Sequence, residues 1–168
     1  ISLYLSCIKA YPKSDVAHYE LGTVFSAIGE NAKAEESLGI AYNLSPENYW
    51  YSIAYSELLK QNNKNSKSLK ILKKARKHNE TNQLTIDFKI AEIYAEQSKY
   101  KKAINFLEEI ERENGLSEMI SFKKFEVYKL QKNYDDAIKV IMELIGEAPE
   151  IAEYQIVLAE FYTEIGDS

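Results

Sequence analysis

Residues 15–48 read DVAHYELGTVFSAIGENAKAEESLGIAYNLSPEN, and this stretch decides the fold. Apolar residues recur in it at helical spacing on both sides of Gly29-Glu30-Asn31, a break that suits a tight turn. Pro46 ends the second helical pattern, because proline lacks an amide donor and restricts the residue before it. The stretch therefore predicts two amphipathic helices joined by a short turn.

The same pattern recurs along the chain with a period close to 34 residues. Small residues mark it at spacings of 34, 35 and 34: Ala34, Ser68, Ala103 and Ala137. Counted from the first residue of each complete repeat (15, 49, 84 and 118), position 24 is always apolar: Leu38, Leu72, Leu107 and Ile141. Helices this short are marginal alone, so each must bury its apolar stripe against its neighbours. A stack of helix pairs is the expected architecture.

The register divides the chain into segments of a single solenoid. The second helix of an incomplete repeat comes first, four repeats follow, and a lone first helix comes last. The expected boundaries are 1–14, 15–48, 49–83, 84–117, 118–151 and 152–168. We therefore expect the chain to be part of a longer protein.

Residues 15–48 resemble a tetratricopeptide repeat. They carry a Leu-Gly pair, an aromatic residue, a turn glycine, small residues and a proline at its signature positions: Leu21, Gly22, Phe25, Gly29, Ala34, Leu38, Ala41 and Pro46. The resemblance covers the whole chain and points to bacterial members of the family. It implies an all-α, right-handed superhelical solenoid of antiparallel helix pairs.

Two repeats depart from the family pattern. The 49–83 repeat has Asn63, Ser68 and Glu80 where the family has Gly, Ala and Pro. In the 118–151 repeat, Lys124 and Phe125 replace a leucine and a small residue, which leaves room for a rotated or more widely spaced helix.

Composition and residue types exclude several functions. The net charge is -5, and only two of the 21 basic residues are arginine, so nucleic acid is not an expected partner. Cys7 is the only cysteine, which excludes an internal disulfide and a metal site with two thiolates. No apolar run approaches the roughly 20 residues of a membrane-spanning helix.

No catalytic constellation emerges from the register. His18 and His78 fall at unlike positions of different repeats, which favours surface or packing roles. Cys7 shares its repeat position with Ala41 and Ala75, which favours a small buried side chain over a reactive thiol. We expect a protein without catalytic residues, bound metal or cofactor.

The family resemblance implies a binding surface on the concave face, lined by the first helix of each repeat. Positions 2, 5 and 9 there form an apolar column beside a column of carboxylates: Tyr19, Trp50, Ile53, Glu57, Phe88, Glu92, Met119, Phe122, Glu126, Ile156 and Glu160. The implied function is a scaffold or adaptor that holds a partner protein or peptide with apolar anchors and basic residues. Apolar position 5 and acidic position 9 differ from the Lys and Asn of family members that clamp chaperone tails.

Alternatives remain at each level. The carboxylates could be solvated and paired with lysines nearby in sequence, namely Lys89, Lys123 and Lys129. The apolar column could pack on a neighbouring helix, and Trp50 could be partly buried against Tyr49, Tyr51 or the preceding repeat. Competing functions are a regulatory or sensor segment of a larger enzyme or transcription regulator, a purely structural stretch, and a helical-repeat RNA binder. Acidity and the 34-residue period count against the last.

Apolar residues near both ends are expected to be exposed unless further repeats or a cap cover them: Leu3, Tyr4, Ile8, Leu158, Phe161 and Ile165. Such ends could pair in an end-to-end dimer of the isolated segment. Localisation is open between cytoplasm and periplasm, because residues 11–22 are similar to exported repeat lipoproteins of Gram-negative bacteria.

Overall fold

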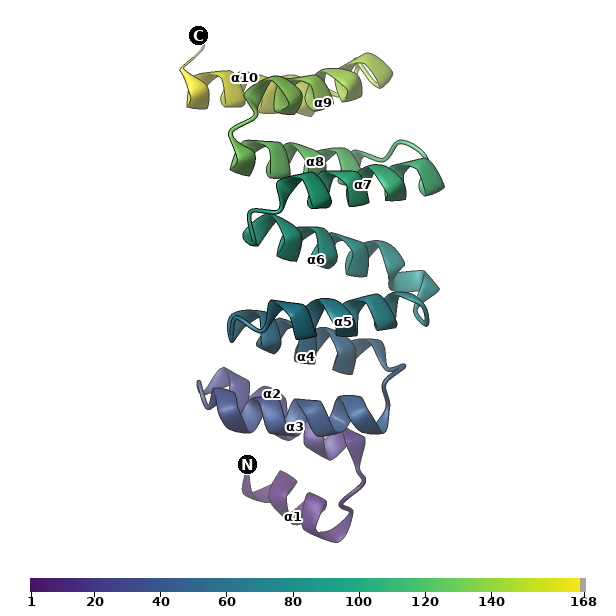
Figure 1. Cartoon of the computed structure of the whole chain (residues 1–168), viewed down its shortest axis with the longest axis vertical. Coiled ribbons are helices and arrows are strands. Elements are labelled where there is room, and N and C mark those ends of the chain that lie inside the picture. The colour runs from purple at the N-terminus through teal and green to yellow at the C-terminus, as the bar shows by residue number, and fades with distance from the viewer. Residues whose placement is uncertain (167–168) are drawn as a thin grey trace. The chain divides into compact units, whose positions relative to one another are not determined.

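The computed structural model describes residues 1–166, which form ten α-helices and one short 3-10 helix. The elements are α1 (Ser2–Ala10), α2 (Asp15–Ala27), α3 (Asn31–Leu44), α4 (Tyr49–Gln61), α5 (Asn65–Arg76), η1 (Glu80–Asn82), α6 (Gln83–Glu96), α7 (Tyr100–Asn114), α8 (Glu118–Gln131), α9 (Tyr134–Glu147) and α10 (Ala152–Ile165). Consecutive helices such as α2 and α3, or α8 and α9, pack as antiparallel pairs (Figure 1). The all-α fold class of helix pairs is thereby confirmed.

The chain divides into two compact units, which are described separately. Unit 1 is Ile1–Ile93 and contains α1 to α5 and most of α6. Unit 2 is Tyr94–Ser168 and contains the end of α6 and α7 to α10. The repeat boundaries inferred from the sequence stay predictions.

Small residues allow α2 and α3 of unit 1 to approach closely. A Cβ atom on Gly22 would lie 2.7 Å from Leu38 Cγ and 2.9 Å from the Leu38 backbone nitrogen. Ala34 is fully buried in the same core, beside Leu21 and Phe25. The signature residues of this repeat are therefore the ones that the helix crossing requires.

The turn inside each pair has one residue in the left-handed conformation. Gly29 occupies it with φ 78°, and the corresponding residues of the later repeats are Asn63, Ser98 and Lys132, with φ 58°, 56° and 60°. Glycine adopts this conformation without strain, and asparagine tolerates it better than most residues. The departure at Asn63 therefore preserves the turn geometry.

In unit 2, α8 accommodates the two large residues that depart from the family pattern. The Phe125 ring packs edge-on against Phe161, with centroids 5.0 Å apart. Lys124 is buried, and its Nζ donates to Glu111 Oε2 of α7 at 2.8 Å. An aromatic contact and a buried ion pair thus replace the usual apolar packing.

The ends of the chain differ in part from expectation. Leu3 is 77% exposed, but Tyr4 and Ile8 are half-buried against the unit 1 core. The expectation that Phe161 would be exposed was wrong, because α10 turns its apolar face to α9 and buries this ring to 2% exposure. Leu158 and Ile165 are half-buried against the same cluster. The end-to-end dimer stays a prediction.

A hydrogen bond fastens the start of α2 to the loop after α3. Ser45 Oγ donates to Asp15 Oδ2 at 2.6 Å, and this bond lowers the pKa of the Asp15 carboxyl. The pKa of the Asp15 carboxyl is lower in the folded protein than in the unfolded chain. The bond therefore contributes its full stability at pH values above the unfolded-state pKa. That stability is lost as pH falls through the folded-state value.

We therefore expect the melting temperature of Asp15→Asn to fall less than that of the wild type as the pH is lowered from about 5 to about 2. Melting curves at a series of pH values measure this slope. The matched control is Asp135→Asn, which removes an exposed aspartate from the first turn of α9. Equal slopes for the two variants would contradict the role of the Ser45 bond.

Candidate functional site

The predicted binding residues are distributed over both units. Positions 2, 5 and 9 of the first helix of each pair are named the first-helix face below. In unit 1 this face contains Tyr19, Trp50, Ile53, Glu57, Phe88 and Glu92, on α2, α4 and α6. In unit 2 it contains Met119, Phe122, Glu126, Ile156 and Glu160, on α8 and α10.

Trp50 is the largest exposed apolar side chain on this face. It lies in the first turn of α4, where the Asn48 side chain caps the helix by accepting from the Trp50 amide at 3.0 Å. The indole is 65% exposed, and its ring makes an edge contact with Tyr49, with centroids 5.0 Å apart. Packing on neighbouring rings therefore buries only a minor part of the indole surface.

Val16 is a residue that the sequence interpretation missed. It has the same repeat position in α2 that Trp50 has in α4, and it is 57% exposed. The repeat register itself contains the signal, because position 2 of the first repeat is apolar. The exposed apolar surface of unit 1 therefore includes residues of two successive first helices.

Position 5 is mainly a packing position. The Tyr19 ring lies against Tyr51 of the next first helix, with centroids 4.9 Å apart, and Phe122 lies against Tyr154 at 6.1 Å. Ile53 and Phe88 are also half-buried, whereas Ile156 is 55% exposed. At Tyr19 and Phe122 this supports the alternative in which the apolar column packs on a neighbouring helix.

The carboxylate column is paired with lysines. Lys89 of α6 bonds Glu57 of α4, and Lys60 of α4 donates to Glu92 of α6 at 2.7 Å, so two ion pairs cross between these helices in opposite directions. In α8, Lys123 donates to Glu126 at 2.7 Å.

Such exposed pairs contribute about 0–1 kcal/mol each. They neutralise much of the negative charge of the column. Lys129, expected near Glu126, instead donates to Glu164 of α10 at 2.5 Å. Attraction of a basic partner is therefore weaker than the number of carboxylates suggests.

His18 and Cys7 are residue types that can take part in catalysis, but here both pack within the fold. His18 is buried, with Nε2 3.0 Å from the carbonyl oxygen of Pro12, and Cys7 is half-buried. Within residues 1–166, no group of three or more His, Cys, Asp or Glu side chains could hold a metal ion. The described helices are all too short or too polar to cross a membrane.

Solved structures of other proteins contain the same arrangement of helix pairs. A tetratricopeptide-repeat (TPR) protein from Parabacteroides merdae ATCC 43184 matches with a TM-score of 0.73 and 18% identity, over 98% of this chain and 65% of that chain. This chain has the TPR fold.

Other TPR structures match over most of their own length. MamA matches with a TM-score of 0.70 and 19% identity, over 90% of this chain and 82% of that one. YrrB, described as a TPR protein with an unusual peptide-binding site, matches with a TM-score of 0.59 and 11% identity, over 98% and 84%. No protein-family model and no curated protein sequence matches. The TPR fold is typically a module for protein–protein interaction.

Proposed function

We propose that this chain is an interaction scaffold whose first-helix face in unit 1 binds an apolar segment of a partner protein, with Trp50 as the main anchor. The observation that carries the proposal is the 65% exposure of the indole. Tryptophan dominates the energetics of protein interfaces, and truncation of such an anchor costs about 2 kcal/mol or more of binding energy. An indole that stays exposed in the free protein is thus available to a partner.

The partner's chemistry follows from the surroundings of Trp50. Val16 extends the apolar surface onto α2, so a segment that crosses α2 and α4 would contact both side chains. Basic residues of the partner would have to displace Lys60 and Lys89 from Glu92 and Glu57. We therefore propose that apolar anchors supply most of the affinity, and basic residues less. In unit 2 the exposed Met119 and Ile156 are the corresponding anchors.

The experiment compares two variants that each remove one exposed aromatic ring. Trp50→Ala removes the proposed anchor, and Tyr11→Ala removes a ring that is 69% exposed in the turn after α1. Partners are captured from a lysate with the wild-type protein, identified, and titrated against all three proteins. We expect Trp50→Ala to weaken binding about 30-fold and Tyr11→Ala to leave it unchanged.

Fluorescence gives a second readout, because Trp50 is the only tryptophan. We expect solvent-exposed emission from the free protein and a blue shift when the partner binds. Both variants should unfold within about 0.5 kcal/mol of the wild type, since surface substitutions change stability little. A partner that binds Trp50→Ala as tightly as the wild type would refute this function for the first-helix face.

A further inference from the structure

The basic residues of this chain are concentrated in one segment. Residues 58–79 contain eight of the 21 basic residues and none of the 26 acidic ones. The rest of the chain therefore has 13 basic residues against 26 acidic ones. The net charge of -5 conceals this separation.

The structure displays most of these charges on one side of α5. The helix buries Ser68, Ile71, Leu72 and Ala75, and it exposes five lysines, named the α5 lysine face: Lys67, Lys70, Lys73, Lys74 and Lys77. The other three basic residues of the segment bond carboxylates of other helices. Arg76 donates to the buried Asp87 at 2.6 Å, Lys60 to Glu92, and Lys64 to Glu35. The α5 lysine face is thus a continuous basic strip on the second helix of its pair.

A groove on α3 reaches Lys64, in the turn that precedes the α5 lysine face. It has a volume of about 510 Å³ and is named the α3 groove; its lining includes Glu35, Gly39, Ile40, Asn43, Tyr55 and Lys64. A Cβ atom on Gly39 would lie 3.2 Å from the Tyr55 hydroxyl oxygen, so the Tyr55 ring comes close to the α3 backbone.

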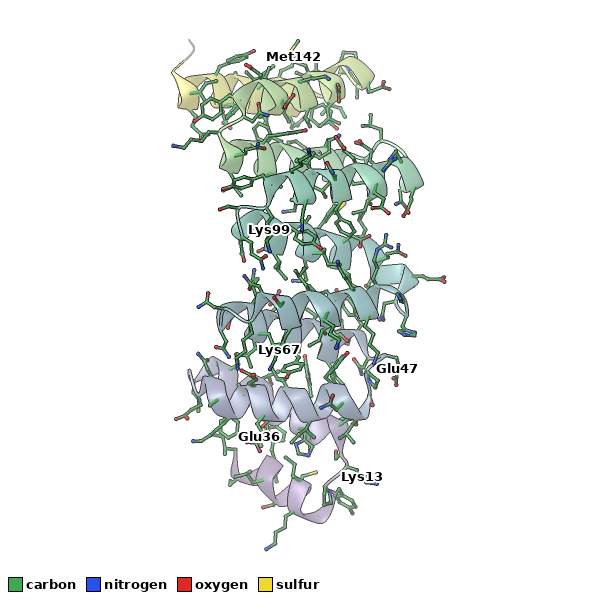
Figure 2. The ribbon with its side chains drawn as sticks, viewed as in Figure 1. Lys13, Glu36, Glu47, Lys67, Lys99 and Met142 are labelled. Atoms are coloured by element: carbon green, nitrogen blue, oxygen red, sulfur yellow. The ribbon has the colours of Figure 1, made fainter. Side chains whose placement is uncertain are left out.

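Two contacts join this groove to the lysines of α5. Lys64, in the turn before α5, donates to Glu35 of α3 at 2.6 Å. The Lys74 ammonium lies 5.7 Å from the centroid of the Tyr42 ring of α3, and that ring is 5.8 Å from Tyr55. Figure 2 labels Lys67 of α5 and Glu36 of α3 on this part of unit 1. An apolar side chain in the groove would therefore lie within reach of the lysines.

We infer that the α5 lysine face and the α3 groove form a second docking surface, for an acidic segment of a partner protein that places an apolar side chain in the groove. Charge complementarity supports this occupant, because lysines on a strip attract carboxylates and orient their approach. The surface lies mainly on α3 and α5 and contains no residue at positions 2, 5 or 9 of a first helix, so it is separate from the first-helix face. One chain could hold two partners at once.

The dimensions favour a polypeptide over nucleic acid. A helix with its side chains is about 10–12 Å wide, so the basic strip is narrower than a DNA duplex. A duplex or a membrane laid on it would also meet Glu35 and Glu36, which line the α3 groove, and Glu47, whose backbone oxygen accepts from Asn79 at the end of the basic segment. No second arginine supplements Arg76 within residues 58–79 for bidentate phosphate contacts. A single chain can follow the strip and place only an apolar side chain beside Glu35 and Glu36, so its own carboxylates stay on the lysines.

The test measures fluorescence anisotropy with a short labelled peptide in which glutamates flank a Leu-Leu pair. The triple variant Lys67→Gln, Lys70→Gln, Lys74→Gln is compared with Lys99→Gln, Lys101→Gln, Lys102→Gln, which makes the same charge change at exposed lysines before and in α7. We expect the first to weaken binding about tenfold and the second less than twofold. Wild-type binding should also weaken about tenfold between about 50 and about 200 mM NaCl.

A second peptide, with Ala-Ala in place of Leu-Leu, tests the groove and should bind the wild type more weakly. Equal loss in the two triple variants, or equal affinity for the two peptides, would overturn the assignment. So would tighter binding of a short duplex DNA or of phosphatidylglycerol vesicles than of the Leu-Leu peptide. Sedimentation distinguishes a second copy of this chain as occupant: self-association that the α5 triple variant abolishes would also overturn the proposal. Melting curves establish that both variants fold.

Discussion

Replacing Glu111 with alanine is expected to lower the free energy of unfolding by about 3 kcal/mol. The Glu111 carboxylate accepts a 2.8 Å bond from Lys124 Nζ, and the Lys124 side chain is only 9% exposed. Without Glu111 the ammonium stays in a poorly hydrated position that no longer has this counter-ion. Urea unfolding followed by circular dichroism measures the loss.

The reverse substitution provides the control. Lys124→Met is expected to cost less than Glu111→Ala, because the Glu111 side chain is 20% exposed and can rotate to bring its carboxylate, whose Oε1 is now buried without a partner, to water. Methionine also fills the space of the lysine methylenes. The double variant Lys124→Met, Glu111→Gln should lie close to the wild type. Equal costs for the two single variants would contradict the view that the buried ammonium is what needs its partner.

Gly22→Ala is expected to lower the free energy of unfolding by about 2 kcal/mol. The added methyl group would come within 2.9 Å of the Leu38 backbone nitrogen, so side-chain rotation cannot relieve the contact. The helices α2 and α3 would have to move apart, which loosens the packing of Leu21 and Phe25. The same urea titration measures this effect.

Gly146→Ala is the matched substitution in a helix that has room for it. A Cβ atom on Gly146, in the last turn of α9, would meet no other atom within 4 Å. We expect this variant to gain about 0.5–1 kcal/mol, because alanine has the higher helix propensity and restricts the unfolded chain. A gain in both glycine variants would show that α2 and α3 do not need their close approach.

Most of the fold could be predicted from the sequence, because its signals are local. Helical periodicity, the 34-residue register and residues such as Gly22 and Pro46 all lie close together along the chain. The register also aligned Asn63 with the turn glycine Gly29, and the structure holds both residues in a left-handed conformation.

The candidate site could be predicted only in part, since burial depends on the helix that packs next to each residue. Trp50 and Tyr19 were placed on one face by the same rule, yet Trp50 is 65% exposed and Tyr19 packs on Tyr51. The pairing of charges could be predicted from the sequence only within one helix, as at Lys123 and Glu126 of α8. Lys89 instead meets Glu57 of another helix.

The sequence by itself therefore determined the fold class, the turns and the two columns of the first-helix face. Only the tertiary structure decided which members of those columns are exposed, which lysines of other helices pair with them, and that a groove on α3 lies near the lysines of α5. The physical reason is one of range. Hydrophobic periodicity and backbone conformation are set by residues close in sequence, whereas exposure and most of the ion pairs described above are set by side chains of other helices.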